Sequence, residues 1–210
     1  MTDATTPPST FDSAYAAGSP PWVINEPQPA IVDLERGGGI RGAVLDPGCG
    51  TSEHTIFLTR LGYDVLGVDA APLALERARA NAADHGVTAR FELADVLHLG
   101  SEPRFDTVVD SALFHIFDDA DRAAYVRGLH AVCRPGGVAH ILALAEGGPP
   151  LGPKISDAVI RAAFADGWTL EDLRPTTYRV TVPADRADSL GMKPGERTDL
   201  PAWLARARRT

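Results

Sequence analysis

The sequence contains few cysteines, very few lysines and no long apolar run. Its two cysteines, Cys49 and Cys133, form neither a metal-ligand spacing nor a disulfide framework, so we expect a reducing, cytoplasmic environment. No apolar run reaches the roughly 20 residues that a membrane-spanning helix needs. Residues 1–8 are polar and lack the apolar centre of a signal peptide. The basic residues are almost all arginine, with only Lys154 and Lys193 as exceptions, a bias that we assign to coding composition.

Positive charge is also scarce, because 20 basic residues face 28 acidic ones and the formal net charge is −8. This deficit argues against nucleic acid and against an anionic membrane surface as partners, since both require a basic patch. The remaining composition is that of an ordinary globular protein, with 210 residues, 23% charged and 44% hydrophobic. We expect one domain over residues 30–210, preceded by an N-terminal arm over residues 1–29, in a monomer or a homodimer.

Short apolar runs alternate with helical patterns from residue 30 onward. The expected strands cover residues 43–45, 64–68, 89–93, 105–109 and 138–144. Strands that alternate with helices of this length predict a doubly wound, mostly parallel, Rossmann-like α/β sheet. Asp118 and Ser156 are expected to cap helices. Residues 168–173 and 178–182 are expected to be extended.

Two segments outside this pattern are predicted to be irregular. Residues 1–10 contain little to bury, and residues 183–200 form a polar loop interrupted by proline and glycine. Residues 11–29 of the arm contain four prolines and the aromatic residues Phe11, Tyr15 and Trp22. This arm is equally consistent with a flap over a ligand and with a cover for one edge of the core.

A glycine-rich turn after the first expected strand gives the clearest chemical signal. Residues 46–53 read Asp-Pro-Gly-Cys-Gly-Thr-Ser-Glu, and a helix follows. Glycines let the backbone approach a ligand closely, and a helix N-terminus attracts negative charge. Asp69 ends the second strand about 20 residues later, where a carboxylate can accept both hydrogen bonds of a ribose diol. Together these features predict a nucleoside ligand.

The turn does not match the dinucleotide fingerprint. The position of its third glycine is occupied by Glu53, and Asp46 immediately before the glycines would repel a pyrophosphate. A carboxylate at this position instead favours a cationic ligand.

Five ordered motifs over about residues 40–145 resemble those of the class I S-adenosylmethionine-dependent methyltransferases. They are Asp46-x-Gly48-x-Gly50, Asp69, Ala94-Asp95-Val96, residues 105–110 and Arg134-Pro135-Gly136-Gly137. Residues 18–22 and 111–117 look like the small bacterial thiopurine and tellurite-resistance-like group, including actinobacterial enzymes for heterocyclic toxins. The resemblance implies an antiparallel last strand near residues 199–206, although Pro201 there locally suggests a helix start. It also implies S-adenosylmethionine as cofactor and methylation of oxygen, nitrogen or sulfur in a small heterocyclic or aromatic molecule.

The resemblance also implies roles for individual residues. Those expected at the cofactor are Trp22 as a cover, Asp46, Asp110 and Ser111 at the ammonium group, Gly48, Cys49 and Gly50 at the methionine part, Asp69 and Ala70 at the ribose, and Asp95 and Val96 at the adenine. Those expected at the acceptor are Phe11 and Phe114 as lining residues and Tyr15 and His115 as catalytic residues. A buried structural histidine is an equally good interpretation of His115, and no metal is expected.

The sequence departs from the family pattern at two positions. Pro47 stands where an aliphatic residue is usual, and Ser52 stands where glycine is usual. We expect Ser52 to cap the following helix; the alternative is that its side chain weakens cofactor binding. Two other functions stay open: a cofactor-binding sensor without turnover, and a nicotinamide-dependent oxidoreductase, which the missing Tyr-x-x-x-Lys disfavours.

Overall fold

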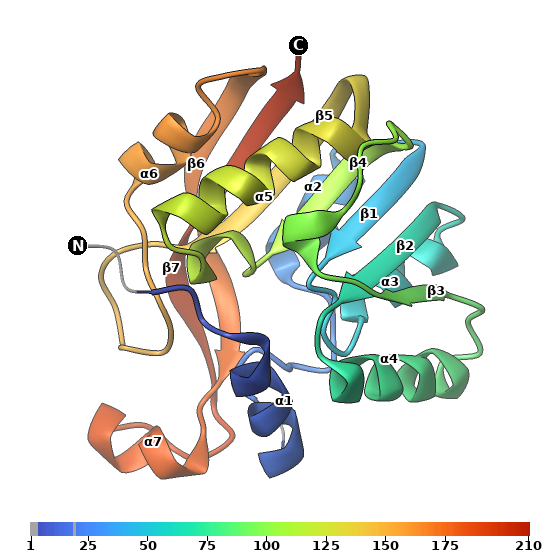
Figure 1. Ribbon diagram of the computed structural model, residues 1–210. Helices are drawn as coiled ribbons and strands as arrows, with labels where there is room; N and C mark the ends of the chain where they lie inside the picture. The colour runs from blue at the N-terminus through green and yellow to red at the C-terminus, as the bar shows by residue number, and fades with distance from the viewer. Residues whose placement is uncertain (1–3, 19) are drawn as a thin grey trace.

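The computed structural model describes residues 4–18 and 20–210 and is built on one seven-stranded sheet (Figure 1). Its strand order is β3-β2-β1-β4-β5-β7-β6. Neighbouring strands from β3 to β5 are parallel, whereas β7 is antiparallel to both β5 and β6. The strands are β1 (Ala43–Pro47), β2 (Asp64–Asp69), β3 (Arg90–Leu93), β4 (Phe105–Ser111), β5 (Cys133–Leu144), β6 (Trp168–Thr181) and β7 (Arg197–Arg209). This topology confirms the predicted fold class.

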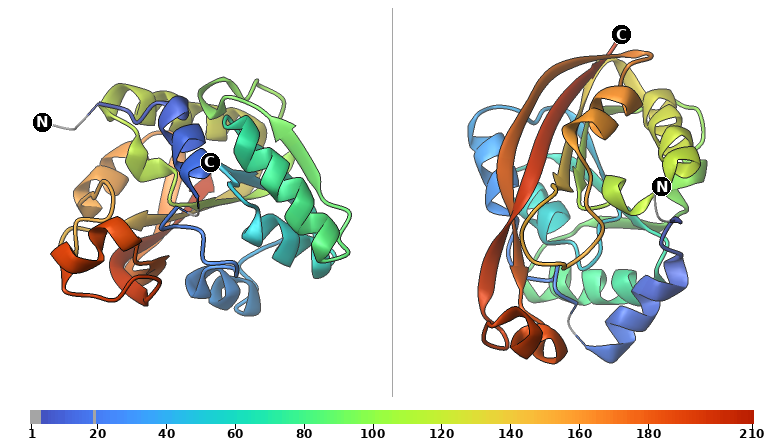
Figure 2. Two further views of the ribbon diagram at one scale, coloured as in Figure 1. Left: turned by 90° about the horizontal axis from the view of Figure 1, so that it is seen from below. Right: turned by 90° about the vertical axis from the view of Figure 1, so that its left-hand side faces the viewer.

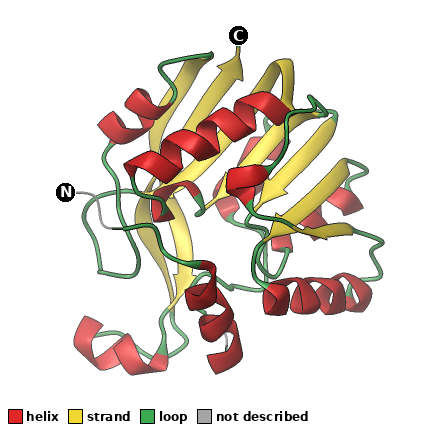
Figure 3. Ribbon diagram, viewed as in Figure 1, coloured by secondary structure: helices red, strands yellow, loops and turns green. Residues whose placement is uncertain are grey.

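Helices cover both faces of the sheet (Figures 2 and 3). The helices are α1 (Pro8–Ala17), α2 (Pro29–Arg36), α3 (Glu53–Arg60), α4 (Pro72–Asp84), α5 (Asp119–Val132), α6 (Asp157–Ala163) and α7 (Ala184–Leu190), with short 3-10 helices η1 (Val96–His98) and η2 (Phe114–Ile116). The α5 and α6 helices enclose one core, and α2 and α3 enclose another on the opposite face. Adjacent strand residues therefore face opposite cores: Leu45 and Val108 pack toward α5, while Val44 and Val109 pack toward α2. All four are fully buried, which explains the continuous apolar runs of the sequence.

Two of the expected helix caps differ in outcome. The Asp118 carboxylate accepts a hydrogen bond from the Asp121 N–H at 2.9 Å, which confirms the cap of α5. Ser156 occupies the corresponding position before α6, but its side chain makes no capping hydrogen bond, so that part of the prediction is wrong. Pro47 is the last residue of β1, where a missing N–H disturbs the ladder least.

The C-terminal third contains more regular structure than predicted. The two extended segments are one strand, β6, and the expected loop over residues 183–200 contains α7 and the first residues of β7. The α7 helix follows Pro183 and ends at Gly191, whose φ of 64° is typical of a helix terminus. The last segment is a strand, as expected from the resemblance. Its two faces are buried in opposite cores, with Ala202 and Leu204 in the core of α2 and α3 and Ala205 in the core of α5 and α6.

The N-terminal segment is also ordered earlier than expected. The α1 helix begins at Pro8, inside the stretch over residues 1–10 that was predicted to be irregular; residues 1–3 lie outside the described residues. Pro8 in the first turn favours helix initiation. In the described parts of the chain, every helix is too short or too polar to cross a bilayer.

Candidate functional site

The glycine turn between β1 and α3 lies at the carboxyl edge of the sheet. Gly48 and Gly50 have φ angles of 66° and 54°, which favour glycine. A Cβ at Gly48 would lie 2.9 Å from a Leu113 methyl carbon, and one at Gly50 would lie 2.8 Å from the Tyr15 hydroxyl oxygen. The Cys49 N–H donates to the Val68 carbonyl at 2.9 Å, which ties the turn to β2. Close approach and conformation both therefore require glycine here.

Asp69 joins this turn to the end of β2. Its Oδ2 accepts a hydrogen bond from the Gly50 N–H at 2.9 Å, and its Oδ1 accepts one from the Ala71 N–H at 2.8 Å. Burial raises the pKa of Asp69, while N–H groups including that of Ala70 oppose the rise. A carboxylate accepts about four hydrogen bonds, so Asp69 keeps acceptor capacity beyond these N–H groups. Asp69 and the glycine turn therefore lie side by side at the carboxyl edge of the sheet.

Asp46 lies beneath the turn. It is 1% exposed, and its Oδ2 accepts a hydrogen bond from the Thr55 hydroxyl at 2.6 Å. Burial raises the pKa of Asp46 to about 7, and the charges of Glu53 and Asp110 act in the same direction. The side chain supports the turn from α3, and a cation bound above it would favour its ionised form.

Asp95 and Val96 lie just after β3. The preceding residue, Ala94, donates its N–H to the Asp69 carbonyl at 3.0 Å, which holds this segment beside the end of β2. The Asp95 Oδ1 accepts a hydrogen bond from the Leu97 N–H at 2.9 Å, and its Oδ2 lies 2.8 Å from the His98 Nδ1. Val96 is buried, while the Asp95 side chain is 55% exposed. The structure thus gives Asp95 a capping role in η1 and leaves it accessible from solvent.

The Asp110 carboxylate points toward α5 and not toward the turn. Its Oδ1 accepts hydrogen bonds from the N–H groups of Leu113 and Phe114 at 3.0 and 3.2 Å, and its Oδ2 accepts one from the Tyr125 hydroxyl at 2.8 Å. Burial raises the pKa of Asp110 to about 6. Asp110 therefore shapes the loop after β4, and only the backbone there is free for the predicted ligand contact. The neighbouring Ser111 hydroxyl is buried and has no hydrogen-bond partner among the described residues.

Backbone strain concentrates at this edge of the sheet. Within residues 4–18 and 20–210, the non-glycine residues with positive φ are Asn25 at 58°, Ser52 at 75° and Ala112 at 71°. Ser52 ends the glycine turn, Ala112 follows β4, and Asn25 belongs to the arm. Such conformations cost about 1 kcal/mol each for a non-glycine residue and cluster at functional sites.

The Ser52 side chain does not cap α3, so the expectation of a cap is wrong. Ser52 has a left-handed backbone, whereas a capping residue needs an extended one. The side chain is fully buried, and its hydroxyl has no hydrogen-bond partner in the described chain.

The aromatic residues of the arm lie against the glycine turn. The Trp22 indole N–H donates to the Tyr15 hydroxyl at 3.0 Å, and the Trp22 ring meets the rings of Tyr15 and Phe11 edge-on, at 6.1 and 5.8 Å between centroids. The Arg77 guanidinium of α4 holds the arm by donating to the Tyr15 and Gly18 carbonyls. Burial raises the pKa of Tyr15, so the hydroxyl keeps its proton near neutral pH.

The second half of the arm crosses to the opposite side of the sheet edge. The Thr181 N–H of β6 donates to the Pro21 carbonyl at 2.8 Å, and the Gln28 amide exchanges two hydrogen bonds with the Arg179 backbone, each 2.8 Å long. Arg197 of β7 pairs with Glu26 at 2.7 Å. Residues 8–18 and 20–28 therefore span from α4 to the β6–β7 pair across the carboxyl ends of the strands (Figure 1).

The surroundings of His115 favour the second of its two expected roles, that of a buried structural histidine, over that of a general base. It is 5% exposed, and its Nδ1 accepts a hydrogen bond from the Leu144 N–H at 3.2 Å. Burial and the charge of Arg122 lower the pKa of His115 to about 4. Because Nδ1 accepts from Leu144, the neutral ring carries its proton on Nε2. His115 ties η2 to the end of β5.

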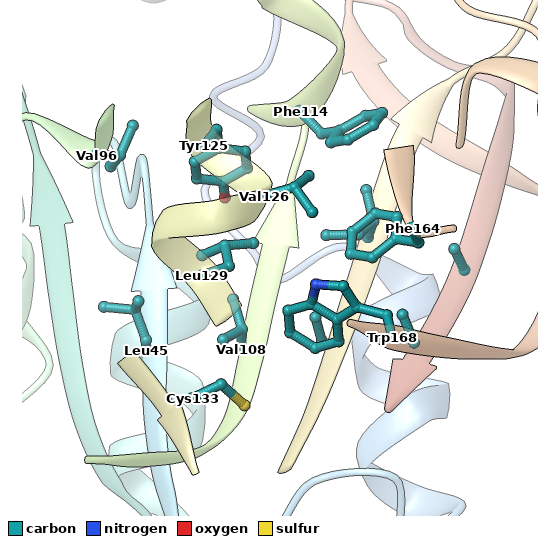
Figure 4. Close-up of a cluster of buried hydrophobic side chains, with 14 of the residues drawn as sticks. Leu45, Val96, Val108, Phe114, Tyr125, Val126, Leu129, Cys133, Phe164 and Trp168 are labelled. Carbon is teal, nitrogen blue, oxygen red and sulfur yellow. The ribbon is translucent and has the colours of Figure 1, made fainter. Parts of the chain in front are cut away.

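Phe114 does not line an acceptor pocket either. Its side chain is fully buried and stacks on Phe164 with 5.9 Å between centroids, within the core that α5 and α6 enclose (Figure 4). The residue that approaches the glycine turn from this loop is its neighbour Leu113, through its contact at Gly48. The expectation that Phe114 lines the acceptor site is therefore wrong for this side chain.

Sequence reasoning also missed Glu53. The Thr51 hydroxyl donates to its carboxylate at 2.7 Å, and burial raises the pKa of Glu53. Glu53 lines a pocket of about 450 Å³ between the arm, α3 and α4, together with Asn25 and Asn81. An acid in the first helical turn after a glycine turn is the signal that could have identified it.

The chain is similar to known methyltransferases. Residues 44–137 match a family model described as a methyltransferase domain. The chain is 34% identical over 178 residues to a 2-heptyl-1-hydroxyquinolin-4(1H)-one methyltransferase of Mycobacteroides abscessus, an alignment that covers 79% of this chain and 78% of the relative.

Two solved structures extend the similarity to nearly the whole chain. One, from work on the conversion of a disulfide bond into a thioacetal group during echinomycin biosynthesis, is 42% identical with a TM-score of 0.86 and covers 97% of this chain and 93% of that one. The other is the 1,6-didemethyltoxoflavin-N1-methyltransferase of Burkholderia thailandensis with bound 1,6-didemethyltoxoflavin and S-adenosylhomocysteine. It is 25% identical with a TM-score of 0.69, and covers 97% of this chain and 87% of that one.

Proposed function

Because this chain belongs to the class I S-adenosylmethionine-dependent methyltransferases, we propose that its methyl acceptor is a small heterocyclic or aromatic molecule, methylated on oxygen, nitrogen or sulfur. The observation that carries this proposal is the extent of the similarity to the hydroxyquinolone methyltransferase, which covers more than three quarters of both chains. The toxoflavin methyltransferase supports the same class of acceptor.

The residues at the carboxyl edge fit this cofactor. Side chains at Gly48 and Gly50 would collide with Leu113 and Tyr15, so the packing of the protein itself requires glycine and the turn offers only its backbone at these positions. The buried hydroxyl of Ser52 has only the weakly bonding Cys49 thiol beside it in the described chain, a deficit that a polar ligand would correct. The cofactor supplies an electrophilic methyl group on a sulfonium sulfur.

Each proposed contact uses a group with remaining hydrogen-bonding capacity. Asp69 accepts from the ribose hydroxyls, with Ala70 beside it, and the accessible Asp95 accepts from the adenine amine next to Val96. The backbone at Gly48, Cys49 and Gly50 borders the methionine part, and Asp46 favours its ammonium group electrostatically. Trp22 covers the site from the arm.

The acceptor enters the site with its nucleophilic atom already able to react. The Nδ1 of His115 is engaged by Leu144, and the Tyr15 hydroxyl keeps its proton and accepts the Trp22 N–H. An acidic hydroxyl acceptor would therefore lose its proton to solvent before transfer. A nitrogen acceptor would attack through its lone pair and lose any proton afterwards, and a thioether or disulfide sulfur has none to lose. The arm, with Phe11 and Tyr15, closes over the acceptor and aligns it.

A substrate panel tests this proposal. The protein is incubated with S-adenosylmethionine carrying a deuterated methyl group and with an N-hydroxyquinolone, 1,6-didemethyltoxoflavin, a phenol, a thiol and a cyclic disulfide. Mass spectrometry should show the labelled methyl group on at least one heterocyclic acceptor, and fragmentation should locate it on oxygen, nitrogen or sulfur. Cofactor binding without any methylated acceptor would contradict the proposed acceptor class.

A further inference from the structure

Ser52 combines two costs that the fold does not require. Its φ of 75° and ψ of 28° would suit glycine, the residue at the two preceding left-handed positions of the turn, Gly48 and Gly50. Its hydroxyl is buried beside the Cys49 thiol, a weak hydrogen-bonding group, and has no stronger partner in the part of the chain that the structure describes. A glycine would remove both the backbone strain and the unsatisfied hydroxyl. We propose that the Ser52 hydroxyl binds the carboxylate of the cofactor's amino-acid part.

The identity of the ligand group follows from the chemistry around the turn. The side chains that flank it, Asp46, Glu53 and Asp69, are hydrogen-bond acceptors suited to an ammonium group and to ribose hydroxyls. A carboxylate needs donors instead. The Ser52 hydroxyl is such a donor, and it lies at the N-terminus of α3, whose positive dipole end favours an anion and which the Ser52 side chain itself does not cap.

This inference rests on the proposed function for the cofactor and goes beyond it, because it assigns a binding contact to the position where the chain departs from the family pattern. Replacement of Ser52 by alanine keeps the positive φ and removes the hydroxyl, whereas glycine removes both. The pair of variants therefore separates the contact from the backbone strain.

The test measures binding by calorimetry with two probes. S-adenosylhomocysteine carries the amino-acid part, and 5′-methylthioadenosine carries the nucleoside and thioether without it. For Ser52→Ala and Ser52→Gly, the Kd for S-adenosylhomocysteine should rise about tenfold to a hundredfold, as expected for the loss of one hydrogen bond to a charged group. The Kd for 5′-methylthioadenosine should not change. The melting temperature of the ligand-free protein should be lowest for the unaltered protein, higher for Ser52→Ala and highest for Ser52→Gly.

Thr59 offers a matched control on the same helix, because its hydroxyl is also buried and unpartnered among the described residues. Thr59→Val should raise the melting temperature without changing either Kd. An unchanged Kd for S-adenosylhomocysteine in both Ser52 variants, or an equal loss for both probes, would overturn the contact. Failure of the unaltered protein to bind S-adenosylhomocysteine would instead contradict the cofactor assignment itself.

Discussion

The helices α3 and α5 are each preceded by a residue type that often caps helices, but only one of the two residues forms a cap. Asp118 has an extended backbone, caps α5 with its carboxylate, and has a pKa that backbone hydrogen bonds lower. Ser52 has a left-handed backbone, makes no cap, and buries an unsatisfied hydroxyl. The start of α5 is complete within the protein itself, whereas the proposed cofactor contact would complete the start of α3. On this proposal, local stability is given up where the cofactor binds.

The largest expected effect is at Asp69, on the ligand-dependent side of this comparison. Asp69→Ala removes the acceptor for the ribose hydroxyls and the support of the Gly50 N–H. The Kd for S-adenosylhomocysteine, measured by calorimetry, should rise about a hundredfold or more. Asp64→Ala at the other end of β2, which loses only an exposed pair with Arg90, should leave the Kd unchanged. Equal binding by the two variants would contradict the ribose assignment.

A smaller loss is expected at the arm. Trp22→Phe keeps an aromatic ring but removes the hydrogen bond to Tyr15, so the arm should close less firmly. We expect the Kd to rise by about tenfold or less. Trp168→Phe is the matched control, because Trp168 lies in the core beside Phe164 (Figure 4) and its substitution should lower the melting temperature without changing the Kd. A Trp22→Phe variant with unaltered binding would show that the arm does not contribute to cofactor affinity.

The pH dependence of stability should reveal Asp46. Folding raises its pKa from 3.8 to about 7, so the folded state keeps a proton that the unfolded state has lost between these values. Its contribution to stability is therefore complete below the lower value and is lost as pH rises through about 7. Relative to the unaltered protein, Asp46→Asn should gain melting temperature as pH increases over this range. A constant difference between the two proteins would contradict the raised pKa.

Binding of a cationic ligand should reverse this effect. A cofactor ammonium group favours the ionised Asp46, so binding should release a proton and strengthen as pH rises toward neutrality. Calorimetry of S-adenosylmethionine in buffers of different ionisation enthalpy measures that proton directly. Asp46→Asn should release none from this position.

Asp118 should show the complementary behaviour. Asp118→Ala removes the cap of α5 and should lower the melting temperature by a few degrees while the Kd for S-adenosylhomocysteine stays the same. Because its folded pKa is lowered, its contribution to stability is present at neutral pH and is lost as the solution is acidified. A change in cofactor affinity on removal of this cap would break the distinction between the two helix starts.

The smallest expected effect concerns His115. His115→Asn retains an acceptor near the Leu144 N–H and removes the imidazole. The pH profile of the methylation rate should have the same shape in His115→Asn as in the unaltered protein and should follow the ionisation of the acceptor. Disappearance of a titration step in the variant would restore His115 as a general base.

The fold was predictable because apolar periodicity reports burial on both faces of a sheet. Val44 and Leu45 face different cores, and this continuous burial is visible as an apolar run. The placement of Asp69 beside the glycine turn was predictable for a different reason: parallel strands have their carboxyl ends at one edge of the sheet.

Individual side chains were less predictable because their roles depend on backbone dihedral angles and on neighbours from distant elements. Ser52 and Asp118 are both capping types, but only Asp118 has the extended backbone that a cap needs. Phe114 and His115 follow the strand that leads to the site, and their burial is fixed by Phe164 and Leu144 from other segments. The α7 helix was missed because its polar sequence has few apolar residues to show a period.

Hydrogen–deuterium exchange with and without S-adenosylhomocysteine tests most directly whether the carboxyl edge is completed by the cofactor. We predict that the ligand slows exchange in residues 48–55, in the arm around Tyr15 and Trp22, and in the loop after β4. The first turn of α5 at Asp118 should exchange at the same rate in both states. Protection confined to other parts of the chain, or equal protection at both helix starts, would contradict the account.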